Sequence, residues 1–188
     1  MNRFAYLPIV ALLSTAAWAA PETFVIDQNH TLPRFSYNHM GFSTQLSRFD
    51  KASGKIVYDP EAHTGSVDVT IDMTSVDTGN DSLNEHLQGP DFFDTAKYPT
   101  ATFKSTIVKF VNGVPASIEG NLTIKGITKP VTLTVTSFKH AMNPMFKKDE
   151  IGADATTTIK RSNFGAGKYV PLVGDEVTLT IPVEAFKE

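Results

Sequence analysis

The chain contains no cysteine in its 188 residues. This absence excludes a disulfide framework, a thiolate nucleophile and a lipid-modified cysteine that would tether the protein to a membrane. Positive charge is not in excess either, because 17 Lys and Arg residues face 20 Asp and Glu residues, for a net charge of −3. Such a balance does not attract nucleic acid or an anionic membrane surface. We therefore expect no nucleic-acid partner, and we expect stability to come from packing and backbone pairing alone.

Long apolar runs are also missing, apart from a short one near the start. The run Leu7–Leu13 is too short to span a bilayer, which needs about 20 apolar residues. Arg3 precedes this run, and small residues follow it up to Ala19. The pattern predicts a secretory signal peptide over residues 1–19, cleaved after Ala19, rather than an N-terminal anchor helix. The remaining residues, 20–188, have the length of a single domain, and we expect no stable membrane insertion from it.

Most of the chain alternates apolar and polar residues with a period of two. From Ser66 onward, Val67, Val69, Ile71 and Met73 fall on one side of an extended chain, with polar residues between them. This period is typical of a half-buried strand. Further strands are predicted over residues 24–27, 33–39, 49–58, 100–110, 118–125, 131–135, 151–161 and 177–183. Turn signals separate them at the spacing of an antiparallel sandwich or barrel, so the fold class is all-β.

One segment, Asp81–Leu87, favours a short helix, because Ser82 and Glu85 stand at the spacing of a capping box. The segment leads into Gly89-Pro90 and then two adjacent rings, Phe92 and Phe93, where a loop is expected. Two interpretations remain open for these rings. They cap or line the mouth of a barrel, or they hold the short helix against the outside of the sheet.

Several other aromatic residues stand at turns, where polar residues are expected. Phe35 and Tyr37 share a strand face with His39, whereas Phe42 follows in a turn and Phe164 lies in a second turn. Apolar residues at turns as well as in strands are what a lumen with an apolar mouth would show. The alternative is that these rings fill the barrel ends as ordinary core.

The histidines do not form a recognisable metal or catalytic motif. No H-E-x-x-H pattern, G-x-S-x-G elbow, phosphate-binding loop or dinucleotide fingerprint occurs, so we expect no metal site and no catalytic residues. Asp27 stands three residues before His30, and we interpret this pair as a carboxylate that orders a turn. An enzyme would have only Asp27, His30 and His39 to work with.

Several longer motifs resemble the YceI-like family, and they occur in its order over nearly the whole chain after residue 23. They are FVIDQNH (24–30), FSYNHMG (35–41), HL (86–87), DFFD (91–94), YP (98–99), FKS (103–105), GNLTIKGITKP (120–130) and RSNFG (161–165). The chain departs from the family at Pro33, which cannot donate to a strand ladder and predicts a bulge or an edge there.

The resemblance implies a lipocalin-like, extended, eight-stranded antiparallel β-barrel of an exported bacterial protein. Such a protein would lie in the periplasm and carry or sequester a long-chain isoprenoid, either a polyprenyl phosphate or an isoprenoid quinone. Binding of fatty acids or fatty amides is the alternative, and an enzyme acting on an isoprenoid is a further one. The resemblance implies no cofactor apart from the bound lipid, and it allows a homodimer.

Eleven residues are candidates for contact with this lipid. For the head group we predict the polar residues His39, Arg161 and Lys168, because two cations bracket a glycine-bearing turn. For the apolar lining or mouth we predict Phe35, Tyr37, Phe42, Phe49, Phe92, Phe93, Phe103 and Phe164.

Overall fold

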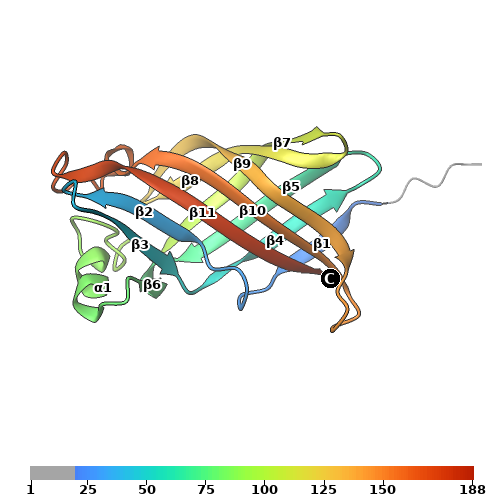
Figure 1. Ribbon diagram of the computed structural model, residues 1–188, viewed down its shortest axis with the longest axis horizontal. Helices are drawn as coiled ribbons and strands as arrows, with labels where there is room; N and C mark the ends of the chain where they lie inside the picture. Colours follow the sequence, from blue (N-terminus) through green and yellow to red (C-terminus); the bar gives the residue numbers. More distant parts are fainter. Residues whose placement is uncertain (1–19) are drawn as a thin grey trace, which may run out of the picture.

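The computed structural model describes residues 20–188, so the predicted signal peptide over residues 1–19 lies outside the described part. The described chain is built almost entirely of strands (Figure 1). The strands are β1 (Glu22–Ile26), β2 (Arg34–His39), β3 (Ser43–Phe49), β4 (Ala52–Asp59), β5 (Thr64–Asp72), β6 (Val76–Asp77), β7 (Thr100–Val111), β8 (Val114–Ile124), β9 (Ile127–Met142), β10 (Asp149–Lys160) and β11 (Val173–Lys187). The helix α1 spans Asp81–Gln88, and two 3₁₀ turns, η1 and η2, span Met73–Ser75 and Arg161–Phe164.

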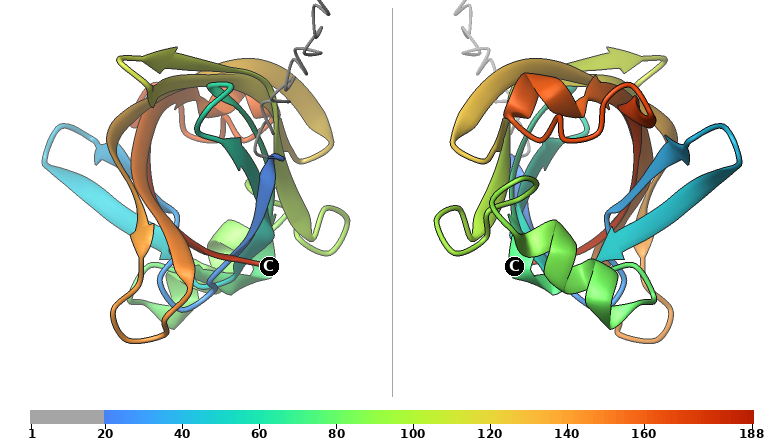
Figure 2. Two further views of the ribbon diagram at one scale, coloured as in Figure 1. Left: turned by 90° about the vertical axis from the view of Figure 1, so that its right-hand side faces the viewer. Right: turned by 90° about the vertical axis from the view of Figure 1, so that its left-hand side faces the viewer.

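The strands form a closed antiparallel barrel in which neighbours in sequence are neighbours in space. β1 pairs with β11 through Phe24 opposite Lys187 and Ile26 opposite Ala185, and this pairing closes the sheet. The barrel has eight long strands, and three of them are interrupted. Each of these three consists of two shorter strands that lie end to end: β1 and β2, β3 and β4, and β5 and β6. The prediction of an all-β, eight-stranded antiparallel barrel with one short helix is confirmed (Figure 2).

The corner between β3 and β4 differs from the prediction. A single strand was predicted over residues 49–58, but the chain turns at Asp50 and Lys51, and a further strand, β3, precedes that corner. Residues 43–46 of β3 are exposed on both faces, so they show no alternation that would reveal a strand. Pro33 lies just before β2, and its carbonyl accepts the Phe49 N–H. Because β2 pairs with both β11 and β3 from Arg34 onward, the strand that follows Pro33 is not an edge.

A short gap in the barrel wall separates β1 from β2. Thr31 fills it: its buried hydroxyl donates to the carbonyl of Glu184 at 3.2 Å and accepts the Glu184 N–H at 3.1 Å. The N–H of Asp27 also donates to the Glu184 carbonyl. One side chain therefore satisfies backbone groups of β11 that a continuous strand would otherwise pair.

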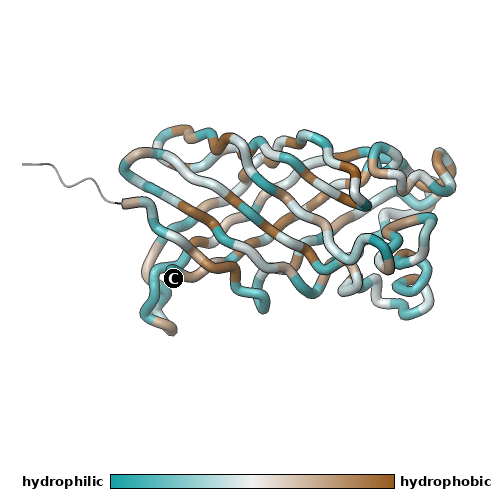
Figure 3. The backbone as a smooth tube through the Cα atoms, turned by 180° about the vertical axis from the view of Figure 1, so that it is seen from behind, coloured by the Kyte–Doolittle hydropathy of each residue, from teal (hydrophilic) through white to brown (hydrophobic). Residues whose placement is uncertain are grey.

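The short helix lies across one end of the barrel (Figure 2). The predicted element exists, but its cap is the side chain of Asn80, which accepts the Leu83 N–H, and not Ser82. Leu83 and Leu87 face inward and pack with the core cluster around Phe35 and Phe49. Figure 3 shows apolar and polar positions alternating along the strands, which is the period-two pattern seen in the sequence.

Candidate functional site

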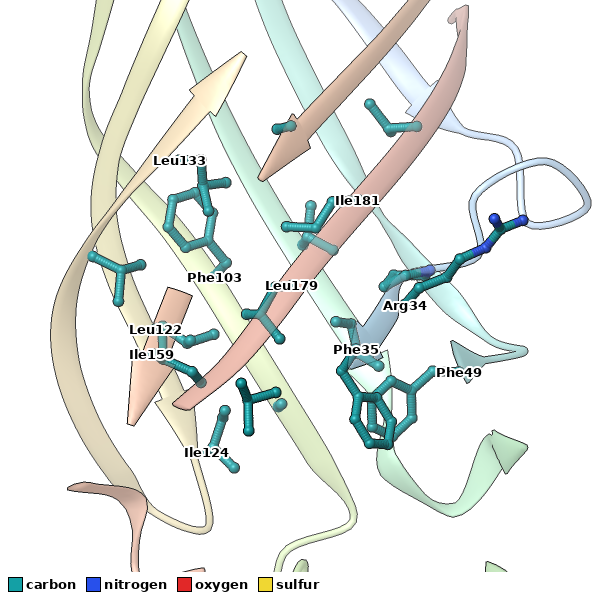
Figure 4. A pocket seen from close by; sticks show the side chains of 18 of the residues that line it. Arg34, Phe35, Phe49, Phe103, Leu122, Ile124, Leu133, Ile159, Leu179 and Ile181 are labelled. Carbon is teal, nitrogen blue, oxygen red and sulfur yellow. The ribbon is translucent and has the colours of Figure 1, made fainter. Parts of the chain in front are cut away.

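The barrel encloses an apolar cavity of about 360 Å³. Its wall consists of the inward-facing residues of the strands, and Figure 4 shows several of them directed into the common space. Along β11, Val177, Leu179, Ile181 and Val183 line the cavity, whereas Thr180 between them is exposed. Other lining residues include Val67, Val69, Ile71, Phe103, Ile118, Leu122, Ile124, Val131, Leu133, Ala155 and Ile159. Such a wall favours hydrocarbon over any polar ligand.

Aromatic rings pack at the end of the barrel away from α1. Tyr58 stacks on Phe110 with ring centroids 6.3 Å apart, and it lies 5.4 Å from the rings of both Phe138 and His140. Burial raises the pKa of the Tyr58 hydroxyl, with a smaller contribution from the neighbouring Asp59. We call Tyr58, Phe110, Phe138 and His140 the aromatic plug, because their mutual packing narrows the cavity at this end.

At the α1 end the cavity reaches exposed side chains, and we call this end the mouth. His39, His86 and Tyr169 are exposed there and line the cavity at the same time. They come from three places in the chain: the end of β2, the helix and the loop between β10 and β11. The mouth residues are Tyr37, His39, His86, Phe92, Arg161 and Tyr169.

Arg161 at the mouth is bound mainly to backbone carbonyls. Its Nε donates to Gly174, Nη1 to Ala166 and Lys168, and Nη2 to Val173. All but one of its N–H groups are thereby used in holding the β10–β11 loop. Burial lowers the pKa of the guanidinium, partly offset by Asp175. Arg161 therefore places a fixed positive charge beside the cavity, near the Tyr37 hydroxyl, whose pKa burial raises.

The predicted lipid-contact residues fall into two groups. Phe42 is 87% exposed in the turn after β2 and is absent from the cavity lining. Lys168 is also absent from the lining, because its ammonium group pairs with Asp91 at 3.3 Å and lies over the Tyr169 ring. The others all line the cavity: Phe35, Tyr37, His39, Phe49, Phe92, Phe93, Phe103, Arg161 and Phe164.

Sequence reasoning missed several lining residues. Phe110 and Phe138 lie inward on long strands, but a register shift separates each of them from the lining residues earlier on its strand. Extending the period of two from Phe103 or Val135 would therefore have placed them on the outer face. Tyr169 comes from a loop and carries no such pattern. His86 was placed on the helix but without a partner; the structure sets its ring 4.9 Å from that of Phe92.

The two adjacent phenylalanines have different surroundings. The ring of Phe93 packs 6.1 Å from Phe35 and 5.7 Å from Phe49, within the core cluster that also contains Leu87. The ring of Phe92 meets His86 and, at 6.2 Å, Tyr169. Both rings line the cavity. Phe92 borders the mouth, whereas Phe93 joins the helix to the inside of the barrel end and not to the outside of the sheet.

We expect single alanine substitutions to separate these roles. Phe93→Ala should lower the free energy of unfolding by about 2 kcal/mol, since it removes a ring packed in the core. Phe92→Ala should change that quantity by less than about 1 kcal/mol and instead speed the release of a bound lipid. Thermal unfolding and lipid off-rates of both variants measure this. If loss of stability and faster lipid release stand in the same ratio in both variants, the two rings do not have separate roles.

A group of ionisable side chains lies at the outer gap between β1 and β2. His30 Nδ1 is 2.6 Å from Asp27 and 3.6 Å from Glu184. The hydrogen bond to Asp27 raises the pKa of His30, and Glu184 adds to this effect. Burial tends to raise the pKa of Asp27, but the hydrogen bonds from His30 and Asn29 outweigh it and lower that pKa. His39 lies at the far end of β2, so the structure does not join it to this pair.

This pair predicts a pH-dependent stability. Because the pKa of His30 is raised from 6.5 on folding, its contribution is fully present below 6.5 and is lost as the pH rises through the raised value. We expect the melting temperature of the protein to exceed that of His30→Gln in mildly acidic buffer, with the difference shrinking in mildly alkaline buffer. Asp27→Asn should remove the same pH dependence. A difference in melting temperature between the protein and His30→Gln that stays constant across this pH range would contradict this role of the pair.

Among residues 20–188, two groups each bring three potential metal ligands within 4.8 Å of one another: Asp27 with His30 and Glu184, and Glu22 with His140 and Asp149. In the second group the ammonium of Lys187 already lies 2.7 Å from Glu22 and 3.8 Å from Asp149. That cation supplies the positive charge which the two carboxylates require.

No helix in the described range is long and apolar enough to cross a bilayer. The family model of the YceI-like domain matches residues 24–185. The protein YceI of Escherichia coli is 35% identical over 185 residues, covering 97% of this chain and 96% of that protein. The crystal structure of Burkholderia cenocepacia BcnA is similar with a TM-score of 0.72 and 31% identity, over 85% of this chain and 99% of BcnA.

A polyisoprenoid-binding domain from Saccharophagus degradans is also similar in fold. Its TM-score is 0.66 at 17% identity, and the match covers 88% of this chain and 98% of the domain. The likeness at this identity concerns the fold alone, whereas the family model and the relatives above 30% identity extend over most of the sequence.

Proposed function

The chain belongs to the YceI-like family, and from this premise we propose that it is a periplasmic lipid-binding protein. Its cargo is a long-chain isoprenoid, a polyprenyl phosphate or an isoprenoid quinone, which it carries or sequesters without chemical change. The observation that carries the proposal is the continuous apolar lining of the lumen between the mouth and the aromatic plug. The fold shared with the polyisoprenoid-binding domain supports an isoprenoid as cargo.

The dimensions of the barrel suit an extended chain. β11 has 15 residues, and at about 3.3 Å per residue and a tilt of about 40° such a strand extends about 38 Å along the axis. Burial of each methylene contributes about 0.8 kcal/mol, so ten methylenes contribute about 8 kcal/mol. Association costs about 4–15 kcal/mol, so this contribution exceeds the cost when the cost is in the lower part of that range. Hydrocarbon can therefore supply most of the affinity.

The polar atoms of the mouth suit an oxygen-rich head group. Tyr37, His39, His86 and Arg161 all line the cavity at this end, and Arg161 has one N–H that is not bonded to a loop carbonyl. A guanidinium, a hydroxyl and two imidazoles at the rim favour a phosphate or a quinone carbonyl. In the proposed complex, the head group stays at the mouth and the chain extends toward the aromatic plug.

Purification from the periplasm without detergent, followed by native mass spectrometry and lipid extraction, tests this function. A stoichiometric long-chain isoprenoid supports it, and the same spectrum reports whether the protein is a homodimer. Recovery of a fatty acid or fatty amide would change the identity of the cargo but leave the lumen as its binding site. A protein that is repeatedly empty and refuses added lipid would overturn the proposal.

A further inference from the structure

Exposed apolar side chains gather beside the mouth. At the tip of the β2–β3 hairpin, Met40 is 48% and Phe42 87% exposed. In the β10–β11 loop, Tyr169 is 50%, Val170 37% and Leu172 68% exposed. We call these five residues the apolar rim. Apolar residues this exposed, on neighbouring loops, mark a surface that another apolar phase covers.

The two halves of the apolar rim are adjacent. His39, the last residue of β2, pairs with Val173, the first residue of β11. The chain continues past this pair into the hairpin tip on one side and comes from the loop on the other, so both segments project from the same end of the barrel. Figure 2 shows the hairpin, in blue and cyan, beside the red loop. Since His39 and Tyr169 also line the cavity, the apolar rim is continuous with the mouth.

Two backbone N–H groups in each tip are bonded within the protein. In the hairpin, the Gly41 N–H donates to the Asn38 side chain at 2.7 Å, and the Phe42 N–H donates to the His39 carbonyl. In the loop, the N–H groups of Val170 and Val173 donate to carbonyls of Gly167 and Tyr169. An N–H that is already bonded does not lose a water partner on entering an apolar medium, so these tips can enter lipid at low cost.

The charges near the apolar rim do not favour an anionic surface. Lys168 is paired with Asp91, and the guanidinium of Arg161 is held by loop carbonyls. The carboxylate of Asp175 accepts from the N–H and hydroxyl of Ser162. With a net charge of −3 for the whole chain, no excess of positive charge attracts acidic lipids.

We propose that the apolar rim inserts into the surface of a zwitterionic phospholipid bilayer and sets the mouth against it, so that a lipid chain enters the lumen without crossing water. This role rests on the proposed function, because it supplies the route by which the cargo is loaded. The depth is that of the boundary between head groups and acyl chains, since the tips are single side chains on loops.

The absence of cysteine permits a direct test on the full chain. A single cysteine is introduced by Phe42→Cys and, in a second variant, by Phe146→Cys, and each is labelled with the polarity-sensitive fluorophore NBD. Phe146 is a matched control: it is 60% exposed in the turn between β9 and β10, at the end of the aromatic plug. Both variants are mixed with phosphatidylcholine vesicles.

We expect the label at position 42 to shift to the blue and brighten with vesicles, whereas the label at position 146 stays unchanged. Equal responses, or none at position 42, would overturn docking through the mouth. Binding that appears only after anionic lipid is added would overturn the zwitterionic surface. The readout does not depend on any cargo, so a protein that never takes up lipid can still show the insertion.

A second measurement uses unlabelled protein. Phe42→Ser should lower the vesicle partition coefficient about tenfold, because an exposed ring no longer enters the lipid, while Phe146→Ser leaves it unchanged. In Phe42→Ser the rate of isoprenoid transfer from vesicles should fall together with the partition coefficient. The affinity of the lumen for lipid should stay unchanged. A Phe42→Ser variant that partitions and transfers like the parent protein contradicts the proposal.

Discussion

Replacing Ile181 with tryptophan should weaken lipid binding about 200-fold while the barrel stays folded. Ile181 points into the middle of the lumen from β11 (Figure 4). The larger tryptophan side chain there takes space from the cargo and separates the mouth from the aromatic plug. Exclusion of only four methylenes from the lumen, at about 0.8 kcal/mol each, corresponds to about that loss of affinity.

The adjacent residue provides the control. Thr180 is exposed on the outer face of the same strand, so Thr180→Trp adds an equal ring to the opposite side of the wall. Titration with a fluorescent isoprenoid analogue measures both affinities, and thermal unfolding measures both stabilities. Equal affinities for the two variants would show that the lumen is not the binding site.

Replacing Arg161 with methionine should lower the free energy of unfolding by about 4 kcal/mol. Methionine keeps the apolar stem but leaves carbonyls of Ala166, Lys168, Val173 and Gly174 without their donor. Charge-assisted hydrogen bonds contribute about 1.5–3 kcal/mol each, less where water can replace the donor. For a chain of this size the melting temperature should fall by about 10 °C.

The head-group role of Arg161 requires a separate readout. Below the lowered melting temperature, Arg161→Met should bind a polyprenyl phosphate more weakly than the parent protein does, with a smaller loss for the matching uncharged polyprenol. Lys168→Met is the control, because its ammonium is paired with Asp91 outside the cavity. Equal losses for phosphate and alcohol would assign Arg161 to loop structure alone.

The lining of the lumen was largely predictable from local pattern. A strand places alternate side chains on opposite faces, so Phe35, Phe103 and the apolar residues of β5 and β11 could be assigned to one face without knowing their neighbours. Phe42 could not, because it lies in a turn after β2, where the period of two no longer applies. β3 was missed for a related reason, since both of its faces are exposed near the hairpin tip.

The contacts between distant segments were not predictable. Thr31 is an unremarkable residue in the sequence, yet it completes the wall opposite Glu184, 153 residues away. Lys168 and Arg161 looked equivalent as two cations around one turn. The structure gives Arg161 four loop carbonyls and gives Lys168 an exposed pair with Asp91, because the path of the loop decides which side chain turns inward.

The sequence by itself determined that this protein is built of antiparallel strands with one apolar face, because alternation along a strand is a local property that needs no knowledge of the partner strand. Only the tertiary structure decided which end opens and what surrounds the opening. The mouth and the apolar rim combine β2, α1, η2 and the β10–β11 loop, and these meet only because β11 returns to pair with β1 and β2. Closure of the sheet is a long-range event, so the site depends on contacts that no local pattern encodes.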